Sequence, residues 1–124
     1  MSKTIFISYH FNDKTFKGEI VKWLKEAGFR TISTDEDDYR PQGENAVRSK
    51  IREQIKESSH LLVLVGNDGH NRPWIDYEIS VAGSLGIKRN WVRLGNRNGA
   101  PPREVRSINE IPYIKEEIIR RLLA

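Results

Sequence analysis

The stretch Leu61-Leu62-Val63-Leu64-Val65-Gly66 is followed by Asn67-Asp68-Gly69-His70-Asn71-Arg72 and then by Pro73-Trp74-Ile75-Asp76-Tyr77-Glu78-Ile79. Its first part is a short, continuously apolar run, which is typical of a strand buried on both faces in the centre of a parallel sheet. The polar residues that follow predict a loop. Pro73 suits the first turn of a helix, where its missing N–H is no loss. We therefore expect a buried strand, a loop and a helix, in that order.

Glu78 is an acidic residue in an apolar part of this expected helix. At helical spacing its neighbours are Trp74, Ile75, Val81 and Ala82. A solvated Glu more often stands among other charged residues on the outer face of a helix. A carboxylate held against apolar surface beside a strand end is therefore a candidate site residue. An amphipathic helix whose Glu lies at the edge of the buried stripe explains the same pattern, and the pattern alone leaves both interpretations open.

The composition is that of one globular domain. The chain has 124 residues, of which 37% are hydrophobic and 31% charged, so it is long enough to bury a core and is unlike a disordered protein. No segment approaches the roughly 20 apolar residues that cross a bilayer. The first apolar stretch, residues 4–8, is too short and too rich in β-formers for the core of a signal peptide. We therefore expect a cytoplasmic protein with no membrane partner.

Several site classes are excluded or disfavoured by residue content. The chain has no cysteine, which excludes disulfides, thiolate catalysis and Cys-based zinc sites. His10, His60 and His70 lack metal-ligand spacing, and the acidic run 35–38 lacks the alternation of a helix–loop–helix calcium loop, so we expect no metal. The net charge of +4 favours anionic partners in general.

Strands and helices alternate along the chain. We expect strands over residues 5–9, 29–34, 61–65 and 89–94, a short fifth strand over 104–108, and helices over 16–27, around 47–55, over 73–86 and from Pro112 onward. Asn12 or Asp13 can cap the first helix, and Gly28 stands where a left-handed helix end is expected. The last helix should turn one apolar stripe inward, formed by Ile114, Ile118, Ile119, Leu122 and Leu123.

This alternation implies an α/β fold with a mainly parallel sheet of four to five strands, flanked by helices. The number of strands favours the flavodoxin-like strand order. In such sheets ligands bind outside the carboxyl ends of the strands, where the strand order reverses. That rule brings together Ser8, Tyr9 and His10 after the first strand, residues 66–70 after the third, and Glu78.

Four sequence features occur in an order that resembles a known family. They are Phe6-Ile7-Ser8-Tyr9 with Asp13, then Pro41-Gln42-Gly43, then Ile55 with Ser58, and finally Trp74-Ile75-Asp76-Tyr77-Glu78-Ile79 with Ala82. In this order they resemble the TIR (Toll/interleukin-1 receptor) domains, most closely the small bacterial TIR-like proteins of the Thoeris anti-phage type. The resemblance implies a single TIR-like domain over residues 1–124 with a flavodoxin-like TIR fold.

The resemblance also implies an activity. It points to an NAD⁺ nucleosidase or cyclase in which NAD⁺ is the substrate, no cofactor is needed, and Glu78 is the catalytic residue of a W-x-x-x-E pattern. The product would be an ADP-ribose-derived nucleotide that signals to a separate effector in anti-phage defence. TIR-type sites are often completed by a neighbouring subunit, so a homo-oligomer is a further expectation. The candidate substrate-binding residues are Ser8, Tyr9, His10, Phe11, Asn67, Asp68, His70 and Trp74.

Three other functions compete with this one. Many TIR domains work by homotypic assembly, so a catalytically silent interaction module is the main alternative. A phospho-receiver protein needs an acidic cluster at the end of the first strand, where this chain has Ser8-Tyr9-His10. Nucleic-acid binding would draw on Lys88, Arg89, Arg93, Arg97 and Arg103, but no recognised motif accompanies them, and we expect no nucleic-acid partner.

Overall fold

The computed structural model describes residues 3–33, 44–66, 73–95, 101–108 and 110–124. In chain order the elements are β1 (Thr4–Ser8), η1 (Phe11–Asp13), α1 (Lys14–Glu26), β2 (Arg30–Ser33), α2 (Glu44–Lys56), β3 (His60–Val65), α3 (Pro73–Ser84), β4 (Lys88–Arg93), η4 (Arg103–Val105), β5 (Glu110–Ile111) and α4 (Lys115–Leu123). The five strands pair in parallel in the order β2-β1-β3-β4-β5. The predicted α/β fold with a flavodoxin-like strand order is confirmed.

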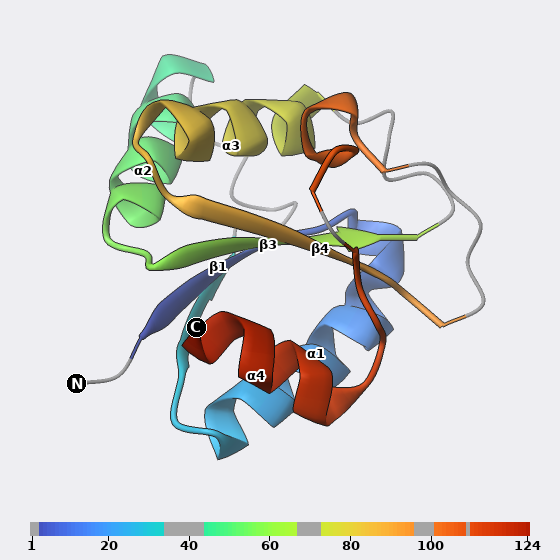
Figure 1. Cartoon of the computed structure of the whole chain (residues 1–124). Helices are drawn as coiled ribbons and strands as arrows, with labels where there is room; N and C mark the ends of the chain where they lie inside the picture. Colours follow the sequence, from blue (N-terminus) through green and yellow to red (C-terminus); the bar gives the residue numbers. More distant parts are fainter. Residues whose placement is uncertain (1–2, 34–43, 67–72, 96–100, 109) are drawn as a thin grey trace.

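Two layers of helices cover the sheet. Figure 1 shows α2 and α3 on one face and α1 and α4 on the other. The side chains of β3 alternate between the two cores: Leu61, Val63 and Val65 pack on the α2/α3 side, whereas Leu62 and Leu64 pack on the α1/α4 side. All six residues of β3 are buried, and β3 occupies the middle of the sheet as its apolar run predicts. β2, which is shorter and more polar, lies at the edge.

Residues 104–108 do not form the strand that we expected. Arg103–Val105 is a short 3₁₀-helix, and the fifth strand is Glu110–Ile111. The backbone amides of this segment are satisfied locally, since Val105 N–H donates to Pro102 and Ile108 N–H donates to Val105. A segment whose amides bond to residues three positions earlier cannot pair as a strand, so the prediction for residues 104–108 was wrong.

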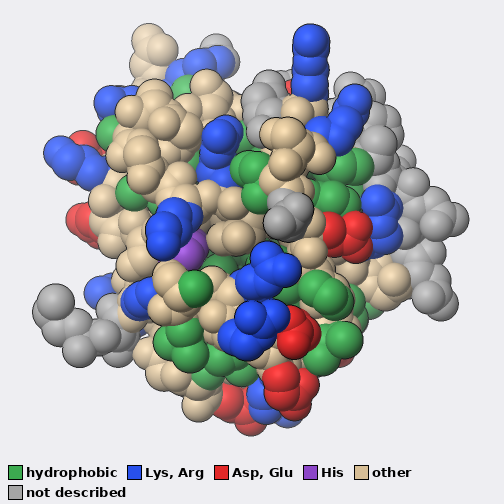
Figure 2. Space-filling model, in the orientation of Figure 1, with side chains coloured by type: hydrophobic (Ala, Val, Ile, Leu, Met, Phe, Trp, Pro, Cys, Tyr) green, Lys and Arg blue, Asp and Glu red, His purple; other side chains and the backbone are tan. Residues whose placement is uncertain are grey.

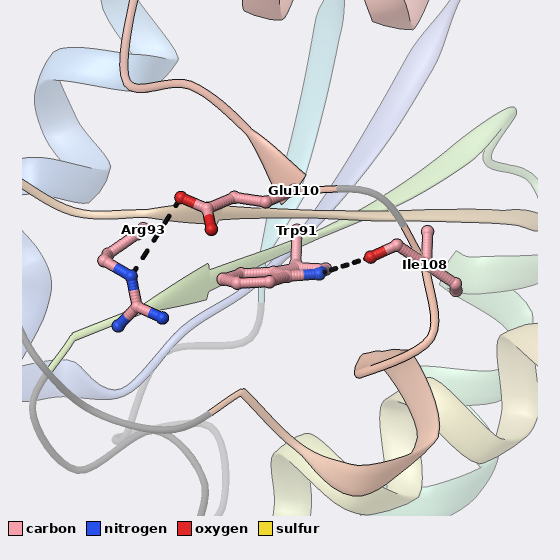
Figure 3. A network of polar contacts seen from close by, with 4 residues as sticks. All are labelled: Trp91, Arg93, Ile108 and Glu110. Carbon is pink, nitrogen blue, oxygen red and sulfur yellow. Dashed lines mark hydrogen bonds and ion pairs between the residues drawn. The ribbon is translucent and has the colours of Figure 1, made fainter.

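The turn before β5 is fixed by a tryptophan. Trp91 of β4 is buried, and its Nε1–H donates to the carbonyl oxygen of Ile108 at 2.8 Å (Figure 3). The guanidinium of Arg93 lies 5.5 Å from the centre of the Trp91 ring, and Arg93 Nε lies 4.0 Å from Glu110 Oε2. A large apolar side chain and one indole hydrogen bond thus hold Ile108 against β4.

The last helix begins later than predicted. Pro112 lies in a turn in which Ile114 N–H donates to the Pro112 carbonyl, and α4 starts at Lys115. Ile118 and Leu122 are buried as expected, but Ile114 and Leu123 are exposed by 50% and 59%. A nine-residue helix presents only a narrow stripe to the sheet, and Ile114, in extended backbone, stands before that stripe begins.

The carboxyl end of α4 meets two lysines at the amino ends of the strands. Lys3 Nζ donates to the carbonyl oxygen of Leu123 at 2.8 Å, and Lys88 Nζ donates to that of Ala124 at 3.3 Å. The last carbonyl groups of a helix lack partners within the helix and carry partial negative charge. The two ammonium groups therefore stabilise this helix end and hold it against β1 and β4.

His60 is buried beside these lysines. Its Nδ1 lies 3.3 Å from Nδ2 of Asn90, and a hydrogen bond also joins it to the carbonyl of Leu122. A neutral imidazole protonated on Nε2 satisfies both contacts, because Asn90 then donates and Leu122 accepts. Burial, followed by the charges of Lys3 and Lys88, lowers the pKa of His60 from its usual 6.5. The histidine is therefore a neutral structural residue.

Two further classes of feature are missing from the residues that the structure describes. None of the helices there is long and apolar enough to pass through a membrane. Over the same residues, no group of three or more His, Asp or Glu side chains is placed to hold a metal ion.

Candidate active site

Ser8 and Glu78 meet at the carboxyl ends of the strands. Ser8 is the last residue of β1, and it lies on the α2/α3 face of the sheet together with Phe6. Its hydroxyl donates to Oε1 of Glu78 at 2.7 Å, across 70 positions of sequence. Ser8 is completely buried and Glu78 is only 3% exposed. The expected association of these two residues is thus present, and Glu78 is not a solvated side chain at the edge of its helix.

Glu78 stands among apolar residues on its helix. Its helical neighbours Ile75, Val81 and Ala82 are all buried in the core on this face. Removing a carboxylate from water is costly unless hydrogen bonds replace the lost hydration. The hydrogen bond from Ser8 supplies part of that replacement. A chain that holds a carboxylate in such a place forgoes the stability of an apolar residue there, which is typical of functional sites.

Asp13 is a second buried carboxyl group at this edge of the sheet, and sequence analysis did not identify it as a site residue. It occupies the N-cap position of α1, yet its side chain makes no capping hydrogen bond. Instead the carboxyl group lies against Gly66, directly after β3: a Cβ atom on Gly66 would come within 2.6 Å of Asp13 Cγ. Gly66 therefore lacks a side chain because Asp13 fills that space. In the sequence, the single sign that another group comes close to the backbone here is the glycine that follows the central strand.

Tyr9 points away from Glu78. It follows Ser8 by one residue, and its ring packs against the core formed with α1 and α4, on the opposite face of the sheet. Lys17 Nζ lies 5.2 Å from the centre of this ring. The structure therefore does not bring Tyr9 together with Ser8 and Glu78.

His10 is part of a turn. It is 6% exposed, its Nδ1 accepts the backbone N–H of Asn12 at 3.1 Å, and its carbonyl oxygen accepts the N–H of Asp13 at 2.8 Å. These bonds shape the connection from β1 to α1 and so place Asp13. The backbone of Phe11 begins η1, but its side chain lies outside what the structure describes. Three further candidates, Asn67, Asp68 and His70, also lie outside the described residues.

Trp74 belongs to a cluster that joins α3 to α2. Its ring lies 6.0 Å from that of Tyr77 in an edge-to-face arrangement. The guanidinium of Arg48 from α2 lies 4.7 Å from the centre of the Tyr77 ring and 5.8 Å from that of Trp74. Tyr77 Oη donates to the carbonyl oxygen of Arg48 at 3.1 Å. Sequence analysis did not identify this contact, because it depends on how two helices pack.

The basic residues do not form one continuous surface in the view of Figure 2. Lys and Arg side chains are scattered over this face, and acidic side chains stand between several of them. A nucleic-acid interface usually shows a basic patch or stripe. The pattern on this face therefore gives no support to the nucleic-acid alternative.

The family model of the Thoeris protein ThsB, TIR-like domain, matches residues 6–98, which is more than half of the chain. The chain belongs to this family. The match spans β1 to β4 and includes both Ser8 and Glu78, so the resemblance inferred from the four sequence features is confirmed. A search of the curated proteins finds no match.

Solved structures show the same fold at low sequence identity. The TIR domain of the Toll-related receptor TRR-2 from Hydra magnipapillata superposes with a TM-score of 0.75 at 15% identity, covering 97% of this chain and 98% of that one. The Clostridium botulinum CMP N-glycosidase BcmB gives 0.66 at 16% identity, with coverage of 97% and 98%. The heterodimer of the RPS4 and RRS1 TIR domains gives 0.66 at 10% identity, with coverage of 99% and 96%. These likenesses establish the fold of this ThsB-family domain.

Proposed function

We propose that this TIR-like domain cleaves the bond between nicotinamide and ribose in NAD⁺, with Glu78 as the catalytic residue and Ser8 as the group that positions it. The observation that carries the proposal is the buried hydrogen bond between Ser8 Oγ and Glu78 Oε1 at the carboxyl ends of the strands. In α/β sheets of this order, this edge is where ligands bind. Membership of the ThsB family supports the assignment.

The chemistry suits a single carboxylate. As the C–N bond breaks, its electron pair leaves with nicotinamide, which was cationic in the substrate and becomes neutral, so no general acid is needed. The ribose is left with oxocarbenium character, and positive charge develops at its anomeric carbon. A preorganised carboxylate in an environment poor in water stabilises that charge more strongly than it stabilises the ground state. Glu78 supplies the charge, and the Ser8 hydroxyl restricts the orientation of the carboxyl group.

The ribosyl cation can then be captured in two ways. Water gives ADP-ribose and releases a proton. A hydroxyl of the same molecule gives a cyclic nucleotide and loses its own proton, whereas an adenine ring nitrogen, which carries no proton, gives a cyclic nucleotide whose purine takes the positive charge and can lose a proton from its amino group. In either case the product is soluble and can reach a separate effector protein in the cytoplasm. We place this reaction in anti-phage defence because the matching family model is that of a Thoeris protein.

The test is consumption of NAD⁺ at high protein concentration, with and without extract of phage-infected cells. Glu78→Gln keeps the size of the side chain but removes its charge, and we expect it to abolish nicotinamide release. Glu53→Gln on the exposed side of α2 is the matched control and should leave the rate unchanged. Chromatography and mass spectrometry of the products separate cyclisation from hydrolysis.

The same assay with CMP examines a second substrate. The fold is shared with a CMP N-glycosidase, an enzyme that by its name also cleaves an N-glycosidic bond. If the protein consumes CMP and leaves NAD⁺ intact, then CMP replaces NAD⁺ as the proposed substrate, and the proposed catalytic role of Glu78 is kept. If the wild-type protein consumes neither compound under any of these conditions, the enzymatic proposal is wrong and an interaction module takes its place.

A further inference from the structure

We infer that Asp13 is a positioning residue of the candidate active site: its carboxyl group holds the turn after β1 against β3 and so keeps the Ser8 hydroxyl within reach of Glu78. This inference deepens the proposed function and rests on it, in that it gives Asp13 a part in cleavage by Glu78. The observation behind it is the buried contact between the Asp13 carboxyl group and the backbone of Gly66.

The contact between Asp13 and Gly66 leaves no space between the two groups. A Cβ atom on Gly66 would overlap both carboxyl oxygens of Asp13, so the carboxyl group occupies the place of a side chain at the carboxyl end of β3. Gly66 continues the alternation of Leu62 and Leu64 along β3, so a side chain there would point to the α1/α4 face, which is the side of the sheet from which Asp13 approaches. The end of the central strand and the start of α1 are therefore in direct contact.

The helix alone does not explain where the Asp13 side chain lies. As the N-cap residue of α1, Asp13 could accept a hydrogen bond from an N–H of the first helical turn, which is the usual role of an aspartate there. Its side chain makes no such bond and lies against Gly66 instead. A negative charge near a helix start is favourable even when it is solvated, yet Asp13 is only 7% exposed. Its burial against β3 therefore indicates a role in joining the two segments.

The contact closes the turn after β1 onto β3. The pairing of β1 with β3 ends at Ser8 and Val63, whereas β3 continues to Val65 and is followed by Gly66. The segment from Ser8 to Asp13 thus meets β3 at both of its ends, first through the sheet and then through the carboxyl group. Removing the carboxyl group frees the second end and gives the end of β1 more freedom to move.

The turn between these two ends carries the constraint to Ser8. The N–H of Asp13 donates to the carbonyl oxygen of His10 at 2.8 Å, and Nδ1 of the buried His10 accepts the N–H of Asn12 at 3.1 Å. A short turn with such internal bonds moves together with the residue that it follows. Ser8 Oγ lies 2.7 Å from Glu78 Oε1, and a shift of roughly 1 Å would take the two atoms beyond hydrogen-bonding distance. Asp13 therefore acts on Glu78 through Ser8.

Kinetics of variants on both sides of the contact test this role. Asp13→Ala removes the carboxyl group, whereas Gly66→Ala displaces it and leaves it present. Each should lower kcat for NAD⁺ about tenfold or more with little change in KM, and by no more than Ser8→Ala does, because all three act on one hydrogen bond. Ile20→Val in the buried stripe of α1 is the matched control, since it weakens the packing of the same helix and should leave kcat unchanged. Unchanged kcat in Asp13→Ala and Gly66→Ala, or an equal fall in Ile20→Val, would overturn the inference.

A double-mutant cycle determines whether Asp13 acts through Ser8. In the Asp13→Ala background, Ser8→Ala should change kcat less than about twofold, because the hydrogen bond that it removes is already lost. In the Ile20→Val background, Ser8→Ala should lower kcat as much as it does in the wild type. If the effects of Asp13→Ala and Ser8→Ala multiply, the two residues act independently and the inference is wrong.

The same cycle in urea unfolding needs no substrate, so it separates this inference from the proposed function. Ser8→Ala should lower the free energy of unfolding less than about half as much in the Asp13→Ala background as in the wild type, and equally in the Ile20→Val background. If NAD⁺ is not cleaved but this coupling is found, the enzymatic proposal fails and the role of Asp13 in placing Ser8 stands. If NAD⁺ is cleaved but the two changes are additive in unfolding and in kcat, the inference is wrong.

Discussion

Replacing Ser8 by Ala removes one hydroxyl group and takes from Glu78 a donor that lies 2.7 Å from Oε1. Nothing else at the end of β1 needs to change, because alanine fits within the volume of serine. The variant therefore separates two roles of Glu78, its burial in the fold and its orientation toward a substrate. We expect it to lower kcat and to leave KM nearly unchanged, since the positioned carboxylate acts on charge that develops in the transition state.

The magnitude follows from the kind of bond. Hydrogen bonds to charged groups contribute about 1.5–3 kcal/mol in proteins, and the loss is greatest where water cannot replace the donor. Ser8 is completely buried, which places this bond in that class. If the whole of that energy bears on the orientation of Glu78 in the transition state, kcat falls by about 10- to 100-fold. The free energy of unfolding should also fall, by about 1–3 kcal/mol.

Ser58→Ala is the matched control. Ser58 is also buried, and its hydroxyl donates to the carbonyl oxygen of Gln54 at 2.9 Å, but it follows α2 at the amino end of β3, far from the site. It should cost about 1 kcal/mol of stability and nothing in kcat. Initial rates over a range of NAD⁺ concentrations and urea unfolding of both variants make the comparison. A Ser8→Ala protein that loses stability as Ser58→Ala does, but keeps its kcat, would refute the positioning role.

Three further variants examine contacts within the fold. Gly66→Ala should lose about 1–3 kcal/mol of stability, because the new methyl group overlaps the Asp13 carboxyl group. In an Asp13→Ala background the same change should cost less. Equal costs in the two backgrounds would contradict this explanation. The pKa of His60 is lowered in the folded protein, so below about pH 6.5 the unfolded chain binds a proton there that the folded protein does not bind. The free energy of unfolding should therefore decrease as the pH is lowered below about 6.5, by up to about 1.4 kcal/mol per pH unit. In urea unfolding, His60→Gln should flatten that slope relative to wild type, and an unchanged slope would exclude the histidine as its source. Trp91→Phe keeps an aromatic ring but loses the bond to Ile108, and a loss of about 1 kcal/mol is expected in urea unfolding, whereas no loss would mean that the bond contributes little.

The central part of the fold could be predicted because its residues carry strong local signals. The run Leu61 to Val65 is apolar at every position, which is typical of a strand covered on both faces. The apolar neighbours of Glu78 at helical spacing made it a candidate site residue, but they left open whether it lies at the edge of the buried stripe. The nearness of Ser8 to Glu78 followed from the rule that ligands bind outside the carboxyl ends of parallel strands, which all lie at one edge of the sheet.

The parts that were missed depend on contacts between distant segments. Residues 104–108 contain β-prone side chains, but their amides bond locally and the Ile108 carbonyl accepts from Trp91, which local sequence does not reveal. The approach of Arg48 to Trp74 depends on how α2 packs against α3. Tyr9 was grouped with Ser8 by nearness in the chain, although alternation along a strand already places neighbouring side chains on opposite faces.

The anchoring of α4 by Lys3 and Lys88 has a practical consequence for experiments. It ties both ends of the described chain to the amino edge of the sheet, and Figure 1 shows the N- and C-termini on the same side of the molecule. Ser8 and Glu78 lie at the opposite edge. A biotin tag joined after Ala124 would thus orient immobilised molecules with the candidate site toward the flowing solution, so a biosensor could record nucleotide binding without obstruction by its own support.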